Sequence, residues 1–332
     1  MPPLSCLRTS SGTKTDTGDR MKFAVISDIH GNAPALRLAL EDAAAHHVDG
    51  YLLAGDYCIS APWASEVVAI LRGLPNAHII RGNDEAHLDV PPGDDGQFEV
   101  SRWCMSTLTP EDKVWLDALP EELTIDCEGV TIRMAHSSQN FVGKCLHEKF
   151  RTSVLPRFYP DGPADRKALL NDFRALWEKD EFRNHIAALD KGIYVFGHNH
   201  IQAWGEFDGR VLVNPGSVGL PLDCGAFGAA YSLLTLEDGH ISVEERRLPM
   251  DAESLIAQVK STGQYAAARV WTEIIFSEWR TVREKVYQFL RHCEQYADSI
   301  GDARRPFAKP TWEAAYAEWT AHAHEWHPDL FV

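Results

Sequence analysis

Seven side chains that can bind a metal ion follow five short apolar runs of this 332-residue chain. The runs are FAVISDIH, YLLAGD, HIIRGND, IRMAH and YVFGHNH. An open β-sheet builds its sites in the crevice beyond the carboxyl ends of its strands, so side chains placed there can converge. The candidate ligands are Asp28, His30, Asp56, Asn83, His136, His198 and His200.

This ligand set predicts phosphate chemistry at two divalent cations. Carboxylate, imidazole and amide oxygen ligands suit hard to borderline ions, and one carboxylate can bridge two of them. Metals about 4 Å apart can generate a hydroxide, clamp a phosphoryl group and stabilise in-line displacement. If strand geometry continues past each run, Asp28 and His30 aim at one point, and His198 and His200 do the same.

The elements that must position these ligands begin with a parallel sheet. The run at 22–28 is a strand of the buried, β-branched type, and Asn32 with Pro34 starts a helix after it. YLLAG is a second strand, residues 63–74 form a second helix, and HIIRG is a third strand. This βαβαβ order predicts right-handed crossovers and parallel strands.

The sheet becomes mixed further along, and two stacked sheets are expected. Residues 98–107 and 110–119 look helical, and a hairpin across Glu128 and Gly129 delivers His136. More strands are predicted at 192–196, 201–207, 210–213, 229–235 and 240–247. We therefore predict an α/β sandwich of two mixed sheets flanked by helices.

Composition divides the chain into parts. Residues 1–20 read as a disordered tail, residues 21–250 as the catalytic domain, and residues 251–332 as a helical extension. Within the domain, residues 141–190 are an insertion that is helical in its second half. A heptad stripe over residues 275–300 predicts a helix that packs on its own domain or joins two copies in a homo-oligomer. The stripe comprises Ile275, Trp279, Val282, Val286, Phe289, Cys293, Tyr296 and Ile300.

The net charge limits the classes of binding partner, and the cysteines indicate the redox state of the compartment. The formal net charge of −16 disfavours extended nucleic acid and anionic membranes as partners. No run approaches the roughly 18 apolar residues of a membrane span. The seven cysteines form no CxxC pair, which favours free thiols in a reducing compartment. We expect a cytoplasmic protein that acts on a small phosphorylated substrate.

The motifs DIH, GD, GN, a lone His and GHNH, in this order, resemble those of the calcineurin-like metallophosphoesterases. NPGSVGLPLD (214–223) is similar to a segment of their compact, prokaryotic phosphodiesterase-like branch, and the resemblance covers residues 21–247. It implies a metallophosphatase fold and two metals bridged by Asp56. The first would be held by Asp28, His30 and His200, and the second by Asn83, His136 and His198.

The chain departs from that pattern at Asp84, where many relatives have a histidine that helps the leaving group depart. Two neighbouring cations would keep the Asp84 carboxyl ionised, which makes it a poor general acid. We therefore expect weak activity on alkyl phosphate monoesters. His87, one turn further along, is a second candidate for the acid, with a solvent-exposed helix position as the alternative.

The resemblance implies a phosphoesterase that uses a metal-bridging hydroxide, with small nucleotidic diesters and dinucleoside polyphosphates as the first substrate choice. The alternatives are a serine/threonine-type phosphoprotein phosphatase and a non-catalytic binding scaffold of the same fold. Imidazole ligands favour Mn²⁺, or Fe, Zn or Ni ions, over Mg²⁺.

Two further sets of residues are candidates, one for binding the substrate and one for holding a metal ligand in place. Lys149, Arg151 and Arg157 belong to a basic island in an acidic chain, which suits contact with a substrate's distal phosphates or, alternatively, pairing with acidic neighbours. Asn214 follows a predicted strand and is expected to bond to a metal ligand, or else only to shape a turn.

Overall fold

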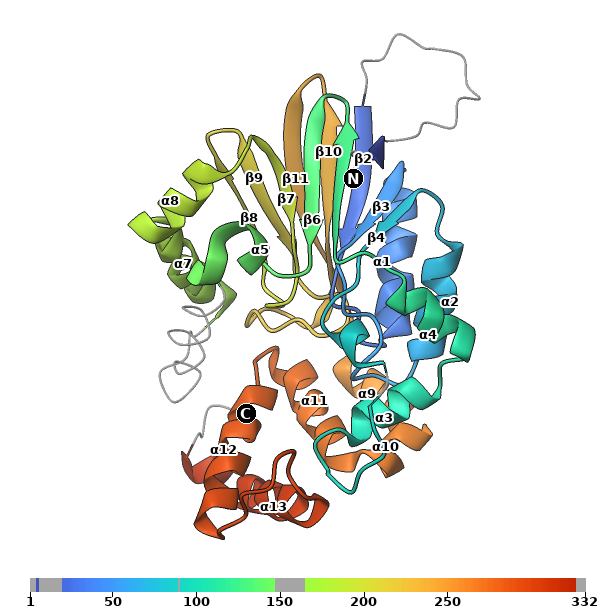
Figure 1. Ribbon diagram of the computed structural model, residues 1–332, viewed down its shortest axis with the longest axis vertical. Coiled ribbons are helices and arrows are strands. Elements are labelled where there is room, and N and C mark those ends of the chain that lie inside the picture. Colours follow the sequence, from blue (N-terminus) through green and yellow to red (C-terminus); the bar gives the residue numbers. More distant parts are fainter. Residues whose placement is uncertain (1–3, 6–19, 89, 147–164, 327–332) are drawn as a thin grey trace.

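The computed structural model of the chain describes residues 4–5, 20–88, 90–146 and 165–326 (Figure 1). Two mixed sheets lie face to face between layers of helices, which confirms the predicted fold class. The five-stranded sheet has the order β11 (His240–Pro249), β10 (Gly228–Glu237), β2 (Arg20–Ile26), β3 (Gly50–Leu53) and β4 (Ala77–Ile79). The six-stranded sheet has the order β1 (Leu4–Ser5), β5 (Glu122–Cys127), β6 (Val130–Ala135), β7 (Gly192–Val195), β9 (Arg210–Pro215) and β8 (Gln202–Phe207).

Strand β2 contributes side chains to the hydrophobic cores on both faces of its sheet. Its side chains alternate, so that Phe23 and Val25 enter the core between the sheets. Ala24 and Ile26 point the other way, into a core shared with helices. Because β2 and β3 are largely buried on both faces, they read as continuous apolar runs, as expected for parallel strands.

Helices cover the outer faces of both sheets (Figure 1). The five-stranded sheet is covered by α1 (Ala33–Ala45) and α2 (Ala64–Gly73), and Asn32 caps α1 as predicted. The helical half of the predicted insertion is also confirmed, because two helices cover the six-stranded sheet: α7 (Arg166–Trp177) and α8 (Asp180–Ala188). The remaining short elements are η1 (Asp84–His87), α3 (Glu99–Ser106), α4 (Pro110–Asp117), α5 (Gln139–Val142) and η2 (Gly143–Cys145).

The predicted disordered tail needs correction at two positions. Leu4 and Ser5 form β1, which pairs in parallel with β5 through Leu4 opposite Ile125. The backbone of an edge strand offers unpaired hydrogen-bonding groups, and a short segment can add to it without a long apolar pattern. Arg20 already belongs to β2. The rest of the tail lies outside the described residues.

The C-terminal residues are helical, as predicted, but the single helix over 275–300 is wrong. It is divided into α11 (Arg269–Thr281) and α12 (Val286–Ser299) by Val282, whose φ of 52° is left-handed. The Glu278 carboxylate explains the break, because its Oε1 accepts the backbone N–H groups of Lys285 at 2.7 Å and Val286 at 3.0 Å. A new helix starts where those donors are satisfied.

Most of the heptad stripe is buried inside the chain. Trp279, Val282, Phe289 and Cys293 have at most 2% of their surface exposed. Self-association stays a prediction, and it would have to use other side chains than these four. The other helices of this region are α9 (Ala252–Lys260), α10 (Gly263–Ala267) and α13 (Lys309–Trp326).

The C-terminal helices pack against the loops at the strand ends of the sandwich (Figure 1). Trp279 donates its indole N–H to the Gly219 carbonyl at 3.0 Å, and Gln264 donates to the Ser60 carbonyl at 2.7 Å. The Ser60 loop follows Asp56, and Gly219 donates its backbone N–H to the Asp28 carbonyl at 3.1 Å, so both bonds join the C-terminal helices to the surroundings of candidate ligands. Within the described ranges, no helix is long and apolar enough to cross a membrane.

Candidate metal centre

The predicted ligands converge, but not because strand geometry continues past the apolar runs. β2 ends at Ile26 and β7 at Val195, before the first ligand of each motif. Five of the candidate ligands have left-handed backbone φ angles, which raise the conformational energy of residues other than glycine. Their φ angles are 52° at Asp28, 50° at His30, 57° at Asp56, 71° at His198 and 59° at His200.

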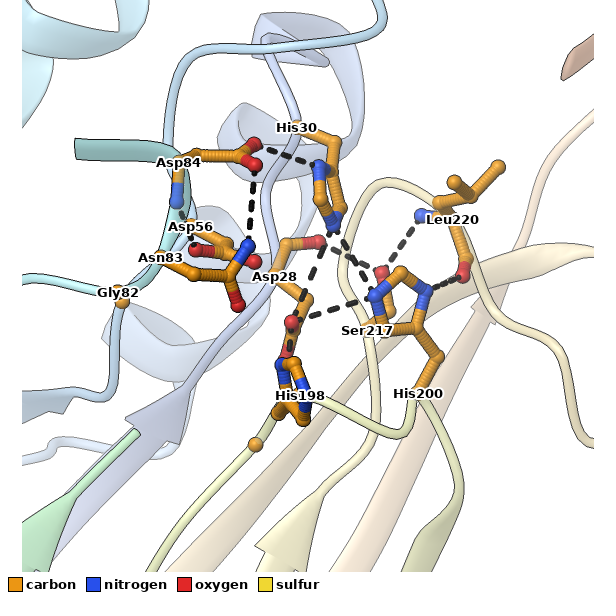
Figure 2. A network of polar contacts seen from close by, with 12 residues as sticks. Asp28, His30, Asp56, Gly82, Asn83, Asp84, His198, His200, Ser217 and Leu220 are labelled. Atoms are coloured by element: carbon orange, nitrogen blue, oxygen red, sulfur yellow. Dashed lines mark hydrogen bonds and ion pairs between the residues drawn. The ribbon is translucent and has the colours of Figure 1, made fainter. Parts of the chain in front are cut away.

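The seven candidates form two adjoining groups, and all of them except His136 are labelled in Figure 2. In the first group, His30 Nε2 lies 3.0 Å from His200 Nε2, which is 3.3 Å from Asp28 Oδ1. In the second group, His136 Nε2 lies 3.2 Å from Asp56 Oδ2 and 3.1 Å from Asn83 Oδ1. His198 joins the second group, and Asp56 is also within reach of His30.

Backbone carbonyls decide which nitrogen of each histidine faces the centre. The Nδ1 atoms of His30, His136 and His200 lie 2.9, 2.6 and 2.7 Å from the carbonyl oxygens of Ile59, Ala54 and Leu220, respectively. A carbonyl accepts only from a protonated nitrogen, so each ring keeps its Nε2 lone pair for the centre.

This arrangement fits a bound cation. With both Nδ1 atoms protonated, the Nε2 lone pairs of His30 and His200 face each other across 3.0 Å, so either a proton on one of them or a metal ion must offset their repulsion. That separation is what two ligands at right angles on one ion with bonds of about 2.1 Å would have. Glycines leave room for the carboxylates, since a Cβ on Gly82 would come within 2.1 Å of Asp56 Oδ1.

Asn214 supports the loop of the ligands rather than a ligand side chain. It is 1% exposed and donates to the Gly197 carbonyl at 3.1 Å and to Asn199 Oδ1 at 2.7 Å. Its partners are therefore the neighbours of His198 and His200 in sequence. Both amide N–H donors are used by this loop, and the side-chain oxygen accepts the backbone N–H of Gly216 at 2.9 Å.

Two supporting residues were missed by the sequence reasoning. Ser217 donates its hydroxyl to the Asp28 carbonyl at 2.6 Å (Figure 2). Glu85, 1% exposed, accepts the backbone N–H groups of Asp56, Tyr57 and Gly82 at 2.8 to 3.0 Å. A carboxylate two residues after Asn83 was the available signal, but its inward direction depends on the η1 turn.

Asp84 lies at the edge of the first group. Its Oδ2 is 3.2 Å from His30 Nδ1, and its backbone N–H donates to Asp56 Oδ1 at 2.8 Å. Burial and the Asp56 charge raise the pKa of the Asp84 carboxyl, against the lowering effect of His30. Two bound cations would lower the pKa of this carboxyl, as His30 does. His87 ends η1, and its side chain lies outside the described residues.

The basic island is described only in part. Lys149, Arg151 and Arg157 lie outside the described residues. Arg166, a further cation of the same island, bonds to Asp223 at 2.9 Å and to Glu245 at 2.7 Å. That arginine joins α7 to the sandwich, so its role is structural.

Buried charges shift the pKa values of the ligand histidines. Burial lowers the pKa of His30, but Asp84, Asp56 and Asp28 outweigh it and raise the value to about 10. For His136, burial is likewise outweighed, mainly by Asp56, and the pKa rises to about 10. The same histidines lower the pKa of Asp56 against the effect of burial. Without a metal, the two imidazoles therefore hold protons at neutral pH.

Metal loading is expected to release protons at pH 8. Below their folded-state pKa of about 10, His30 and His136 are protonated, so a cation must displace up to one proton from each. The affinity for Mn²⁺ should therefore rise with pH up to that value, by up to about tenfold per pH unit for each displaced proton. Calorimetry in two buffers of different ionisation enthalpy measures the release. Equal apparent enthalpies in both buffers would contradict this expectation.

Together, the fold and this site define an α/β sandwich protein with an Asp/His/Asn centre suited to two metal ions. A family model for the calcineurin-like phosphoesterase superfamily domain matches residues 21–239. The chain therefore belongs to that superfamily, which confirms the resemblance of its motifs. Its members typically hold a centre of two metals.

The chain is similar to proteins of solved structure. A metallophosphoesterase from Sphaerobacter thermophilus is 24% identical, with 75% of this chain and 99% of that chain covered and a TM-score of 0.49. The hypothetical protein PH1004 from Pyrococcus horikoshii is 16% identical, with 77% and 97% covered and a TM-score of 0.51. The second likeness supports the fold alone. No curated protein matched the chain.

Proposed function

We propose that the chain is a dimetal-dependent hydrolase of phosphodiester or phosphoanhydride bonds, with small nucleotidic substrates favoured. The observation that carries this proposal is the set of three histidines whose Nδ1 atoms are held by carbonyls, so that their Nε2 atoms face two buried carboxylates. Such preorganisation suits a metal centre, and no candidate ligand of the family pattern is missing from the chain.

The two groups of side chains suggest the assignment of the metals. Asp28, His30 and His200 would hold one ion, and Asn83, His136 and His198 the other. Asp56, close to both groups, would bridge them. When bound, the two ions would activate a water molecule and withdraw charge from the phosphoryl group. The imidazole content favours Mn²⁺ over Mg²⁺.

Hydrogen bonds within the protein would hold the candidate ligands in position. Hydrogen bonds from the His198 backbone N–H at 3.0 and 3.2 Å hold the Asp28 carboxylate in place. Glu85 fixes the two loops that carry Asp56 and Asn83. A cytoplasmic location belongs to the same proposal, because six cysteines in the described ranges are free thiols.

The proposal is tested with purified full-length protein loaded separately with Mn²⁺, Fe²⁺, Zn²⁺ or Ni²⁺. We expect two bound ions per chain by elemental analysis and metal-dependent release of 4-nitrophenol from bis(4-nitrophenyl) phosphate. Chelation should abolish the release, and returning Mn²⁺ should restore it. A chain that binds no metal and shows no turnover would instead support the scaffold interpretation.

A further inference from the structure

Beyond the candidate ligands lies a cavity of about 250 Å³ whose far wall comes from the C-terminal helices. On one side it is lined by His30, Asp56, Asn83 and His200. On the other side, α11 contributes Trp271, Ile275 and Glu278. These three occupy positions i, i+4 and i+7, so they share one face of the helix. One face of α11 therefore forms this wall.

A second cavity of about 690 Å³ adjoins the first. Both are lined by Ile59, Asp84 and Trp271. The further lining of the second cavity is mainly apolar and includes Leu88, Pro91, Pro92, Phe98 and Leu290. Together the two cavities offer more room than a phosphoryl group needs, and the apolar part of their walls suits the organic part of a ligand.

Two buried polar atoms on the α11 face lack hydrogen-bond partners among the described residues. Glu278 is 1% exposed, and while its Oε1 accepts two backbone N–H groups, its Oε2 has none. The indole Nε1 of Trp271 is also buried and without a partner. Buried polar atoms are nearly always satisfied, so each orphan points to a partner that a ligand would supply.

The charges around the wall disfavour a phosphate there. Glu284 also lines the first cavity. Apart from the candidate ligand histidines, the basic groups of this region are Lys285 and Arg283, and burial followed by Arg283 lowers the pKa of Lys285 to about 7. Burial and Glu284 raise the pKa of Glu278. The wall therefore offers hydrogen bonds with little positive charge, which suits a neutral polar group better than a polyphosphate.

We propose that this α11 face is the nucleobase subsite of the enzyme, with Glu278 Oε2 and Trp271 Nε1–H bonding to polar edges of the base. The inference rests on the proposed phosphoesterase function and deepens it. The metal centre holds the phosphoryl group, while a flat, neutral group with donors and acceptors fills the cavity between the apolar side chains. Glu278 is the specificity residue of this subsite, and a substrate with further phosphates on that side fits poorly.

The test compares two 4-nitrophenyl phosphodiesters whose second ester group is either thymidine, through its 5′ oxygen, or methyl. Both release 4-nitrophenol, so the bond that breaks is the same. In the wild-type enzyme, KM for the thymidine ester should be at least about tenfold lower than for the methyl ester, as expected for two hydrogen bonds. In Glu278→Gln and in Trp271→Phe, this KM ratio should fall to within about threefold.

The matched control is Glu273→Gln, the same change on the same helix. Glu273 bonds to the Tyr265 hydroxyl and does not line the cavity. This variant should keep the wild-type KM ratio. Equal KM values for the two esters in the wild type, or a ratio untouched by both wall variants, would overturn the subsite.

Binding of free thymidine, measured by calorimetry on the full chain, separates the two proposals. Thymidine should bind the wild type and lose at least about tenfold in affinity in Glu278→Gln. Binding without hydrolysis of either ester would refute the phosphoesterase proposal and keep the subsite. Hydrolysis of both esters without thymidine binding would refute the subsite alone. If Glu278→Gln fails to fold, the KM ratios of the wild type and of Trp271→Phe still test the subsite.

Discussion

Replacing Asp56 with asparagine is expected to lower turnover of an aryl phosphodiester by about 10²- to 10³-fold, the usual cost of removing one preorganised electrostatic element. Asp56 is 2% exposed and lies close to both groups of candidate ligands. The amide keeps the shape and an oxygen that can accept the Asp84 N–H, now 2.8 Å from Asp56 Oδ1. What it loses is the negative charge needed between two cations.

Elemental analysis should show fewer than two ions per chain in Asp56→Asn. Circular dichroism should show an unchanged fold. Asp42→Asn is the matched control, because Asp42 on α1 bonds to Arg246 and Tyr231, away from the centre. It should keep both metals and full turnover. An Asp56→Asn enzyme with two ions and wild-type turnover would exclude Asp56 as the bridge.

Asp84→His is expected to raise kcat/KM for alkyl phosphate monoesters by about 10²-fold, the lower end of what a general acid contributes. In the wild type, the carboxyl lies 3.2 Å from His30 Nδ1, next to the centre. Two cations there would keep it ionised, so it would have no proton for an alkoxide leaving group. An imidazole at this position can carry a proton at neutral pH.

The measurement is a series of monoesters with leaving groups of increasing pKa. Wild-type rates should fall steeply along the series, while those of Asp84→His should fall less. Aryl esters, which need no proton, should change little. Asp84→Asn serves as the control, because it removes the charge without adding an acid and should not rescue alkyl esters. A shallow dependence in the wild type would show that another acid, such as His87, is already at work.

The fold class and the candidate ligands could be read from the sequence because each motif is local. An apolar β-branched run indicates a strand, and the polar residue at its end falls at the sheet's edge by topology. The route by which Asp28 and His30 converge could not be predicted, since left-handed φ angles leave no period in the sequence. Alternation along an extended strand predicted that Asp28 and His30 converge, and in the structure they converge through left-handed turns instead.

The C-terminal region shows a second limit. The heptad spacing correctly indicated helix over most of 275–300, but Val282 carries no sign of a break. The break depends on Glu278, whose carboxylate turns inward to cap α12 only in the folded chain. The cavity wall on α11 was also missed, because it brings Trp271 to the same cavity as Ile59, which lies far away in the sequence.

That separation along the chain has a consequence for biosynthesis. All seven candidate ligands, from Asp28 to His200, precede α9, whereas Trp271 and Glu278 are translated much later. Chains emerge from the ribosome N-terminus first, at about 5–20 residues per second, so the ligands leave the exit tunnel before the helix that faces them. Under the two proposals, the residues that would bind the ions are thus made before the helix that would select the organic part of a substrate.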